Sequence, residues 1–271
     1  MISISSVNLI ITAAGSSTRL GIGSKKEYLS MQDKDNNTVL SLACIGFLNV
    51  FLDKKISKYF KLSSLIITCP VGRISEAKNA LFSNKKIFDM LAQLEIEVNF
   101  VEGGETRQLS VLRALEFSEK LQKEKELLML KNCSYFDNGC KMGYKPPSLV
   151  LIHDGARPWI DFNTIENVLS VTRDKGACVP IVPITDTIAF YKDEKILSYI
   201  DRSSVCCLQT PQGFLFEKLL EAHRKSISEK RQDCTDDTTL WKTYCGDVFT
   251  CPGSTKNTKI TFASDLERIG K

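Results

Sequence analysis

The chain has 271 residues, of which 43% are hydrophobic and 25% charged, with a formal net charge of +4. This composition is typical of a globular protein with a sizeable core, and the basic excess is too small to indicate a nucleic-acid-binding protein. No apolar stretch reaches the roughly 18 residues of a membrane span, and the N-terminal run lacks the positive start and the length of a secretory signal. We therefore expect neither nucleic acid nor membrane as a partner.

The ten cysteines do not follow the pattern of a disulfide scaffold, because the chain is long and has the composition of a full core. We expect reduced thiols and a cytoplasmic protein. No CxxC occurs, and the two histidines, His153 and His223, lie far apart in the sequence. A structural zinc site is therefore not expected.

Short apolar runs alternate with helical patterns along the chain. Because the runs are continuously rich in Val, Ile and Leu, they are typical of strands buried on both faces of a sheet. Strand–helix alternation predicts an α/β fold with a doubly wound, mostly parallel sheet. We expect strands at 7–12, 64–69, 95–101, 148–154 and 177–182, and helices at 39–50, 75–82 (capped by Ser75) and 107–122.

Two segments interrupt this alternation within what we expect to be a single domain spanning 1–271. Residues 123–147 combine charges with a polar Gly/Asn/Pro stretch, which predicts a surface insertion. Residues 184–212 alternate apolar and polar residues around "YKDEK", which predicts a projecting β-hairpin arm. Such an arm invites a role in dimer contact or in closing a site.

The segment after the first predicted strand, "TAAGSSTRLGIGSKK", is small and then basic. Gly15 permits a sharp turn with close backbone approach, and exposed N–H groups there can form an anion-binding nest. Arg19 and Lys26 would add positive charge. The segment is neither a P-loop nor a dinucleotide fingerprint, and read alone it is equally compatible with an ordinary turn bearing solvated cations.

Polar clusters also follow the third and fourth predicted strands, where ligands bind in open α/β sheets. In "EGGETRQLSVL", Gly104 can let a ligand touch the backbone, and Ser110 lies in the first turns of a helix. In "HDGARPW", Asp154 could hold Mg²⁺ through its carboxylate. His153 points to the opposite face and is expected to be a packed histidine, while Arg157 is expected to brace the loop by pairing with Asp154.

In order along the chain, these segments resemble the 2-C-methyl-D-erythritol 4-phosphate cytidylyltransferases of the non-mevalonate isoprenoid route. The family's opening pattern is matched by "AAGSSTRLG" and "KKEYL", and its later patterns by "GGETRQLSV", "HDGARP", Asp186-Thr187 and "QTPQ". "TDD" at 235–237 and "NTKIT" with the following "DL" complete the series, and 235–239 alone is typical of a helix N-cap. The resemblance covers nearly the whole chain except 123–147 and implies a nucleotidyltransferase-like fold.

Three positions depart from the family's pattern. Ser17 replaces the second glycine of the first loop, Lys25 replaces a proline, and Gly155 replaces an alanine. The insertion is also longer than the family usually has. Because Lys25 precedes the family's key lysine directly, two adjacent lysines compete for one role.

The resemblance implies transfer of CMP from CTP to methylerythritol phosphate, with release of pyrophosphate. Arg19 and Lys26 would stabilise the transition state, and Asp154 would lie near Mg²⁺. Ala14, Gly15, Gly104 and Ser110 would contact the nucleotide.

Three further residues would serve the second substrate. Arg202 and Lys259 would position the polyol phosphate, with Thr187 close to it. Arg202 lies on the predicted arm, which in the family reaches into the neighbouring subunit. A homodimer with shared sites is the expectation that follows.

Other functions stay open at this point. A ribitol-5-phosphate cytidylyltransferase of the same superfamily is the nearest alternative, although "AAG" and "QTPQ" favour the first assignment. A nucleotide-sugar glycosyltransferase on a similar sheet is a second alternative; it would usually carry an Asp-x-Asp metal motif, a pattern that occurs here only at Asp33-Lys34-Asp35. A regulatory module without catalysis would not need the complete set of Arg19, Lys26, Asp154 and Lys259.

Overall fold

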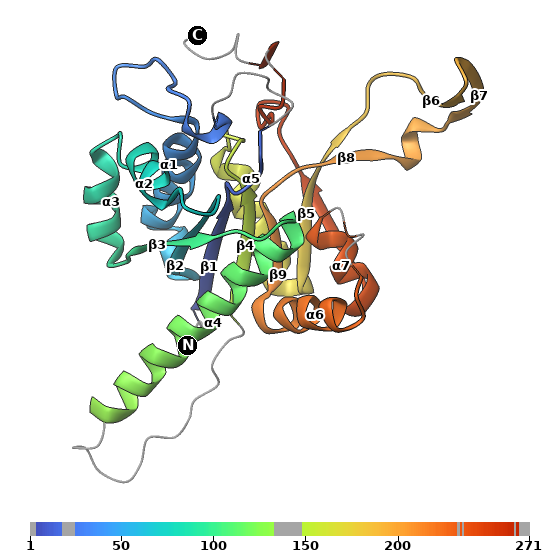
Figure 1. The fold of residues 1–271 in the computed structure, drawn as a ribbon. Coiled ribbons are helices and arrows are strands. Elements are labelled where there is room, and N and C mark those ends of the chain that lie inside the picture. Colours follow the sequence, from blue (N-terminus) through green and yellow to red (C-terminus); the bar gives the residue numbers. More distant parts are fainter. Residues whose placement is uncertain are drawn as a thin grey trace.

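A computed structural model of the chain describes residues 4–17, 25–132, 148–231, 234, 236–262 and 264–265 (Figure 1). Its centre is a twisted sheet with helices on both faces. The sheet contains, in spatial order, β10 (Phe249–Pro252), β5 (Ala177–Pro183), β9 (Gln212–Leu215), β4 (Leu149–Asp154), β1 (Ser5–Thr12), β2 (Phe60–Cys69) and β3 (Val98–Glu102).

The sheet is mostly parallel, as the sequence predicted. β1 pairs in parallel with both β2 and β4, and β10 pairs in parallel with β5. The exceptions are β9, which lies antiparallel between β4 and β5, and the short β8 (Cys206–Leu208), which pairs antiparallel with the end of β5. β9 carries the last residue of "QTPQ", so this motif is built into the middle of the sheet.

The helices divide between the two faces of the sheet. They are α1 (Val39–Leu52), α2 (Ile74–Leu81), α3 (Lys86–Leu94), α4 (Arg107–Asn132), α5 (Phe162–Lys175), α6 (Phe216–Ser228) and α7 (Asp237–Tyr244), with 3-10 turns at Lys26–Tyr28, Ile56–Lys58 and Arg202–Ser204. Leu9 and Ile11 of β1 pack with one core, which includes Phe47 of α1. Ile10 between them packs with the other core, which includes Leu115 of α4. This alternation explains the continuous apolar runs, because both faces of each central strand are buried.

Some helices begin at a capping side chain. Thr38 caps α1 in a reciprocal bond with Ser41, and the side chain of Asp236 accepts a bond from the Thr239 N–H at the start of α7. The expectation that Ser75 caps the helix at 75–82 was wrong. α2 begins at Ile74 after Arg73, whose side chain makes no capping bond, because the turn that precedes it starts the helix one residue earlier.

The first part of the expected insertion is helical. Residues 123–132 continue α4, which we attribute to their run of strong helix formers, and residues 133–147 lie outside the described residues. The arm within 184–212 contains a β-hairpin of β6 (Ile188–Lys192) and β7 (Lys195–Ile200). Figure 1 shows this hairpin projecting away from the sheet.

The cysteines that the structure describes form no disulfide. In the described part of the chain, no helix combines the length and the apolarity that crossing a bilayer requires.

Candidate nucleotide-binding site

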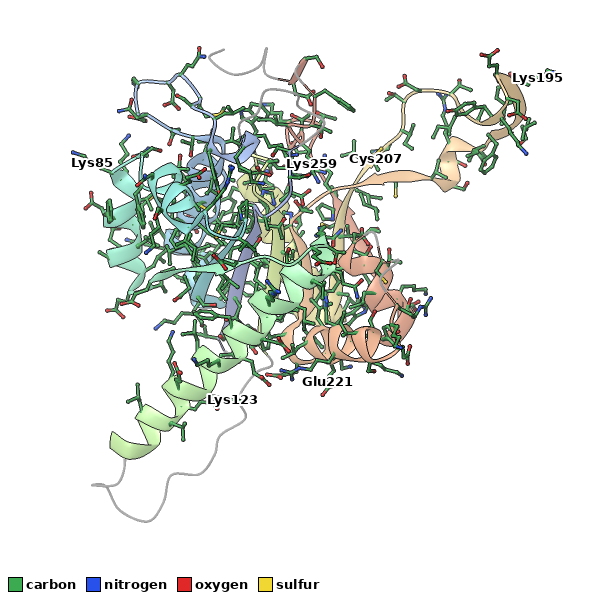
Figure 2. The ribbon with its side chains drawn as sticks, in the orientation of Figure 1. Lys85, Lys123, Lys195, Cys207, Glu221 and Lys259 are labelled. Carbon is green, nitrogen blue, oxygen red and sulfur yellow. The ribbon has the colours of Figure 1, made fainter. Side chains whose placement is uncertain are left out.

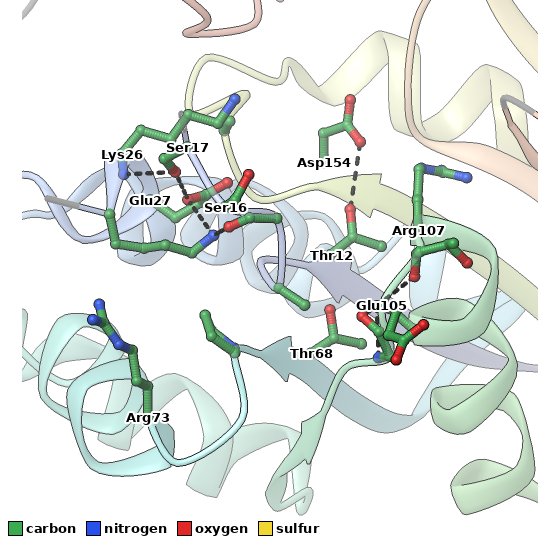
Figure 3. A pocket seen from close by; sticks show the side chains of 18 of the residues that line it. Thr12, Ser16, Ser17, Lys26, Glu27, Thr68, Arg73, Glu105, Arg107 and Asp154 are labelled. Atoms are coloured by element: carbon green, nitrogen blue, oxygen red, sulfur yellow. Dashed lines mark hydrogen bonds and ion pairs between the residues drawn. The ribbon is translucent and has the colours of Figure 1, made fainter. Parts of the chain in front are cut away.

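A cavity of about 790 Å³ opens at the carboxyl ends of β1, β2, β3 and β4. This is the edge of an open α/β sheet where ligands bind, and the volume lies within the range of small-molecule sites. Five segments distant in sequence supply the walls: the loop after β1, the loop after β2, the Gly-rich turn before α4, the loop after β4, and the segment after β10 that carries Lys259 (Figure 3).

The structure brings most of the predicted site residues to this cavity. Ala14, Gly15, Lys26, Gly104, Ser110, Asp154 and Lys259 all line it. Arg19 lies outside the described residues. Thr187 and Arg202 do not line it, as described below.

The loop after β1 is held together by charged side chains. The Lys25 ammonium donates to the carbonyl oxygen of Gly15 and lies 3.1 Å from the Glu27 carboxylate. Burial lowers the pKa of Lys25, and the attraction of Glu27 opposes this only in part. Lys26 turns elsewhere, with its Nζ donating to the carbonyl oxygen of Ile260 at 2.9 Å. The two adjacent lysines therefore have different anchors, although both line the cavity.

Ser17, which stands where the family has a glycine, adopts a backbone conformation that favours glycine. Its φ is +56°, in the left-handed region where glycine is favoured. A non-glycine residue there costs about 1 kcal/mol. Its hydroxyl accepts from the Lys26 N–H at 3.3 Å and donates to Glu27 at 3.4 Å. These two bonds tie the strained residue to the turn that carries both lysines.

The Gly-rich turn before α4 packs directly on the first loop. A Cβ at Gly103 would lie 2.4 Å from the Ala14 Cβ and 2.7 Å from the Ser110 hydroxyl. The Gly104 N–H donates to that hydroxyl at 3.0 Å. Glycine is required at 103 because the two loops touch there, and this contact forms one continuous wall of the cavity.

Asp154 is a buried charge in the wall of the cavity. Its Oδ2 lies 2.8 Å from the Lys259 ammonium and 3.5 Å from Nε of Arg157, and its Oδ1 accepts from the Thr12 hydroxyl at 3.4 Å. Burial alone would raise the pKa of this carboxyl, but Lys259, Arg107 and Arg157 outweigh it and hold the pKa well below its ordinary value. The carboxylate is therefore ionised and can act as a ligand for a cation.

Arg157 and His153 have the structural roles that the sequence predicted. Arg157 pairs with Asp154 and donates through Nη1 to the Asn257 carbonyl at 2.7 Å, which braces the loop. His153 is fully buried against the ring of Phe47, and its ring nitrogens contact the Thr210 hydroxyl and the Arg157 carbonyl. Burial lowers the pKa of His153 to about 4.

Thr187 and Arg202 lie apart from the cavity. Both are exposed, and Arg202 donates through Nη1 to the carbonyl oxygen of Thr185 on its own arm. Figure 2 shows Lys195 at the hairpin tip, far from Lys259 beside the cavity. Within one copy of the chain, the predicted site is therefore divided between the cavity and the arm.

Sequence reasoning missed two positively charged residues of the cavity, Arg73 and Arg107. Arg107 begins α4, and Arg73 follows β2. The rule that ligands meet the carboxyl ends of strands could have found both, because Arg73 comes shortly after Pro70 and Arg107 shortly after the Gly-rich turn. Figure 3 shows the two side chains on opposite sides of the cavity.

No group of three or more His, Cys, Asp or Glu side chains in the described ranges could hold a metal ion. A site built from protein ligands alone is thus not present in that part of the chain. A single ionised carboxylate, Asp154, remains suitable for Mg²⁺, which commonly takes one or two carboxylates together with phosphate oxygens and water.

Comparison with known proteins agrees with this geometry. Residues 138–269 match the model of the family described as IspD, 2-C-methyl-D-erythritol 4-phosphate cytidylyltransferase. A protein of that name from Bacillus cereus is 30% identical over 261 residues, which cover 95% of this chain and 93% of the relative.

Two further relatives place this match in context. The bifunctional enzyme IspD/IspF of Bartonella bacilliformis is 33% identical over 178 residues, and the match covers 65% of this chain but only 39% of that enzyme. The crystal structure of 2-C-methyl-D-erythritol 4-phosphate cytidylyltransferase from Thermus thermophilus aligns with a TM-score of 0.62 and 25% identity over 98% of this chain and 96% of that one. The similarity thus extends over sequence and fold.

Proposed function

This chain belongs to the 2-C-methyl-D-erythritol 4-phosphate cytidylyltransferase family, and from that premise we propose that it transfers CMP from CTP to 2-C-methyl-D-erythritol 4-phosphate. The products are the CDP-methylerythritol and pyrophosphate, and the reaction belongs to non-mevalonate isoprenoid biosynthesis. The observation that carries the proposal is one cavity lined by Gly15, Lys26, Gly104, Asp154 and Lys259 together.

The reaction is an in-line displacement. A phosphate oxygen of the polyol phosphate attacks the α-phosphorus of CTP, and the bond to pyrophosphate breaks. The protein has little covalent work to do, so positioning and charge neutralisation supply most of the acceleration. Arg19 and Lys26 are proposed to stabilise the charge that spreads over the phosphoryl oxygens.

The nucleotide is proposed to lie along the wall where the two loops touch. Ala14 and Gly15 offer backbone on one side, and Gly104 and Ser110 offer an N–H and a hydroxyl on the other. The close packing at Gly103 supports this arrangement, because it makes the two loops one surface.

Mg²⁺ is proposed as the cofactor. Asp154 would hold it, and the ionised state of this carboxylate supports the assignment. When bound, the ion would neutralise phosphate charge. Lys259, which pairs with Asp154, is proposed to move its charge to the phosphate of the polyol substrate.

A homodimer is proposed to complete the site. The arm exposes large apolar side chains, which are Phe190, Tyr191, Ile196, Leu197 and Tyr199. Such a concentration on one hairpin is typical of a surface that a partner covers. Arg202 and Thr187 lie at the base of this arm, so a second copy could receive them at its cavity. A cytoplasmic location stays a prediction of the sequence.

The test measures pyrophosphate release with CTP, Mg²⁺ and either 2-C-methyl-D-erythritol 4-phosphate or ribitol 5-phosphate. We expect release with the first polyol phosphate, none without a polyol phosphate, and release at least ~10²-fold slower when a Lys26→Ala variant replaces the wild type at the same concentration. Release with ribitol 5-phosphate alone would favour the sister activity. No release with either substrate would refute a cytidylyltransferase.

A further inference from the structure

A chain of polar contacts leads from the cavity to a buried histidine behind it. Arg107 lines the cavity, and its Nη1 donates to Oδ2 of Asp237 at 2.6 Å. The other oxygen of Asp237 lies 3.1 Å from Nε2 of His223. The three residues come from the starts of α4 and α7 and from the middle of α6, so tertiary structure alone joins them.

Asp237 is almost completely buried, with 2% of its surface exposed. Burial by itself would raise the pKa of its carboxyl, but the charge of Arg107 and the hydrogen bond from His223 outweigh burial and keep the pKa below its ordinary value. A buried carboxylate costs several kcal/mol unless partners compensate it. The position at the first residue of α7 adds the favourable end of the helix dipole.

His223 is fully buried and is a second hydrogen-bond partner of Asp237. With its hydrogen on Nε2, the ring donates to Asp237. Its Nδ1 is buried and has no hydrogen-bond partner among the described residues. Among the described residues, the ring therefore makes its one side-chain hydrogen bond to Asp237, and this bond orients the ring.

The guanidinium of Arg107 has further N–H groups that can donate to a ligand in the cavity. Its bond to Asp237 uses Nη1, and the Arg107 side chain makes no other hydrogen bond to a described residue. The side chain is 29% exposed. In Figure 3 its guanidinium lies on the same side of the cavity as Asp154. A guanidinium fixed at one nitrogen presents its other donors with little loss of rotamer entropy.

We propose that Arg107 contacts an oxygen of the bound CTP, an inference that rests on the proposed function. Asp237 and His223 are positioning residues that hold Arg107 in place. The nucleotide is favoured over the polyol phosphate because Arg107 begins the helix that directly follows the Gly-rich turn. That turn and Ser110 form the cavity wall assigned to the nucleotide.

The affinity for CTP tests the contact. The dissociation constant is measured by isothermal titration calorimetry with Mg²⁺ and without a polyol phosphate. Loss of one charge-assisted hydrogen bond weakens binding by about tenfold or more. We therefore expect Arg107→Ala and Asp237→Asn each to raise the dissociation constant by at least about tenfold, and Arg107→Lys to restore little, because lysine lacks the planar fork.

A double variant separates positioning from general stability. If Asp237 acts through Arg107, adding Asp237→Asn to Arg107→Ala should change the dissociation constant by less than about twofold. If the two substitutions instead raised the dissociation constant independently, so that their factors multiplied in the double variant, the positioning role of Asp237 would be overturned. So would an Asp237→Asn variant that melts earlier but binds CTP as the wild type does.

His223 offers a milder variant, should Asp237→Asn fail to fold. Glutamine can donate to Asp237, whereas leucine cannot. We expect His223→Gln to bind CTP close to the wild type and His223→Leu to bind it several-fold more weakly. Equal affinities for the two variants would overturn the role of His223. These measurements need binding only, so a wild type that binds CTP but releases no pyrophosphate would refute the proposed function and leave this inference standing.

Discussion

The ammonium of Lys259 lies 2.8 Å from the carboxylate of Asp154. The pair joins the end of β4 to a segment that follows the last strand, at the floor of the cavity. Because Arg157 and the field of Arg107 also act on Asp154, a cation that entered here would compete with three positive groups. We therefore expect the proposed Mg²⁺ to bind only together with a substrate that draws some of these positive groups away.

The two adjacent lysines are expected to differ. Lys26→Ala should lower kcat by at least ~10²-fold, the scale of removing one preorganised charge. Lys25→Ala is the matched control and should lower kcat much less. It should instead reduce the free energy of unfolding by on the order of 3 kcal/mol, because it leaves the buried Glu27 without its partner. Steady-state kinetics with thermal melts measure both effects, and a larger kcat effect for Lys25→Ala would transfer the role to Lys25.

Two glycines of the cavity should respond oppositely to alanine. A Cβ at Gly15 would meet nothing within 4 Å, so Gly15→Ala should keep the melting temperature but raise the KM for CTP, because the backbone approach is blocked. Gly103→Ala should lose on the order of 1–3 kcal/mol of stability, since its methyl overlaps Ala14. An unchanged KM for Gly15→Ala would show that the nucleotide does not approach this backbone.

The arm is expected to act on the neighbouring subunit. Arg202→Ala should raise the KM for the polyol phosphate more than that for CTP, whereas Lys195→Ala, at the exposed hairpin tip, should change neither. At a polyol phosphate concentration so low that each variant alone is nearly inactive, mixing Lys26→Ala and Arg202→Ala proteins should recover roughly a quarter of the wild-type activity. Random mixing makes half of the dimers hybrids, and each hybrid contains one intact site of two. A mixture that stays inactive after subunit exchange would contradict sharing of the site.

The buried His153 should make the protein less stable as the pH decreases. Its pKa is lowered from 6.5 to about 4 by burial, so between these values the unfolded chain binds a proton that the folded chain does not. Stability is therefore full above pH 6.5 and decreases as pH falls toward 4, by on the order of 3 kcal/mol in total. Urea unfolding of the wild type and of His153→Asn, in buffer without divalent cations, should give curves that converge toward pH 4. Parallel curves would contradict this origin.

The sheet and most of the cavity could be predicted because their signals are local. The apolar runs at 64–69 and 148–154 lie within β2 and β4 or overlap them closely, and the turn at Gly103 and the cap at Asp236 depend on neighbouring residues. The antiparallel β9 could not be predicted, because four residues of mixed character have no clear period.

Contacts between distant segments carried no sequence signal of this kind. Nothing in "TDD" or around His223 reveals that Asp237 joins Arg107, since the contact depends on how α4, α6 and α7 pack. The anchors of Lys25 and Lys26 likewise depend on Gly15 and Ile260, which no spacing rule connects to a choice between two neighbouring lysines.

The place of β9 has a consequence for synthesis on the ribosome. β9 follows β4 and β5 in the chain, yet it lies between them and pairs with both. A nascent chain that has emerged only as far as β5 holds two parts of a sheet without the strand that joins them. Lys259 emerges later still. The cavity therefore acquires its full set of charges only after Lys259 has emerged, and a nascent chain interrupted earlier cannot display a complete site.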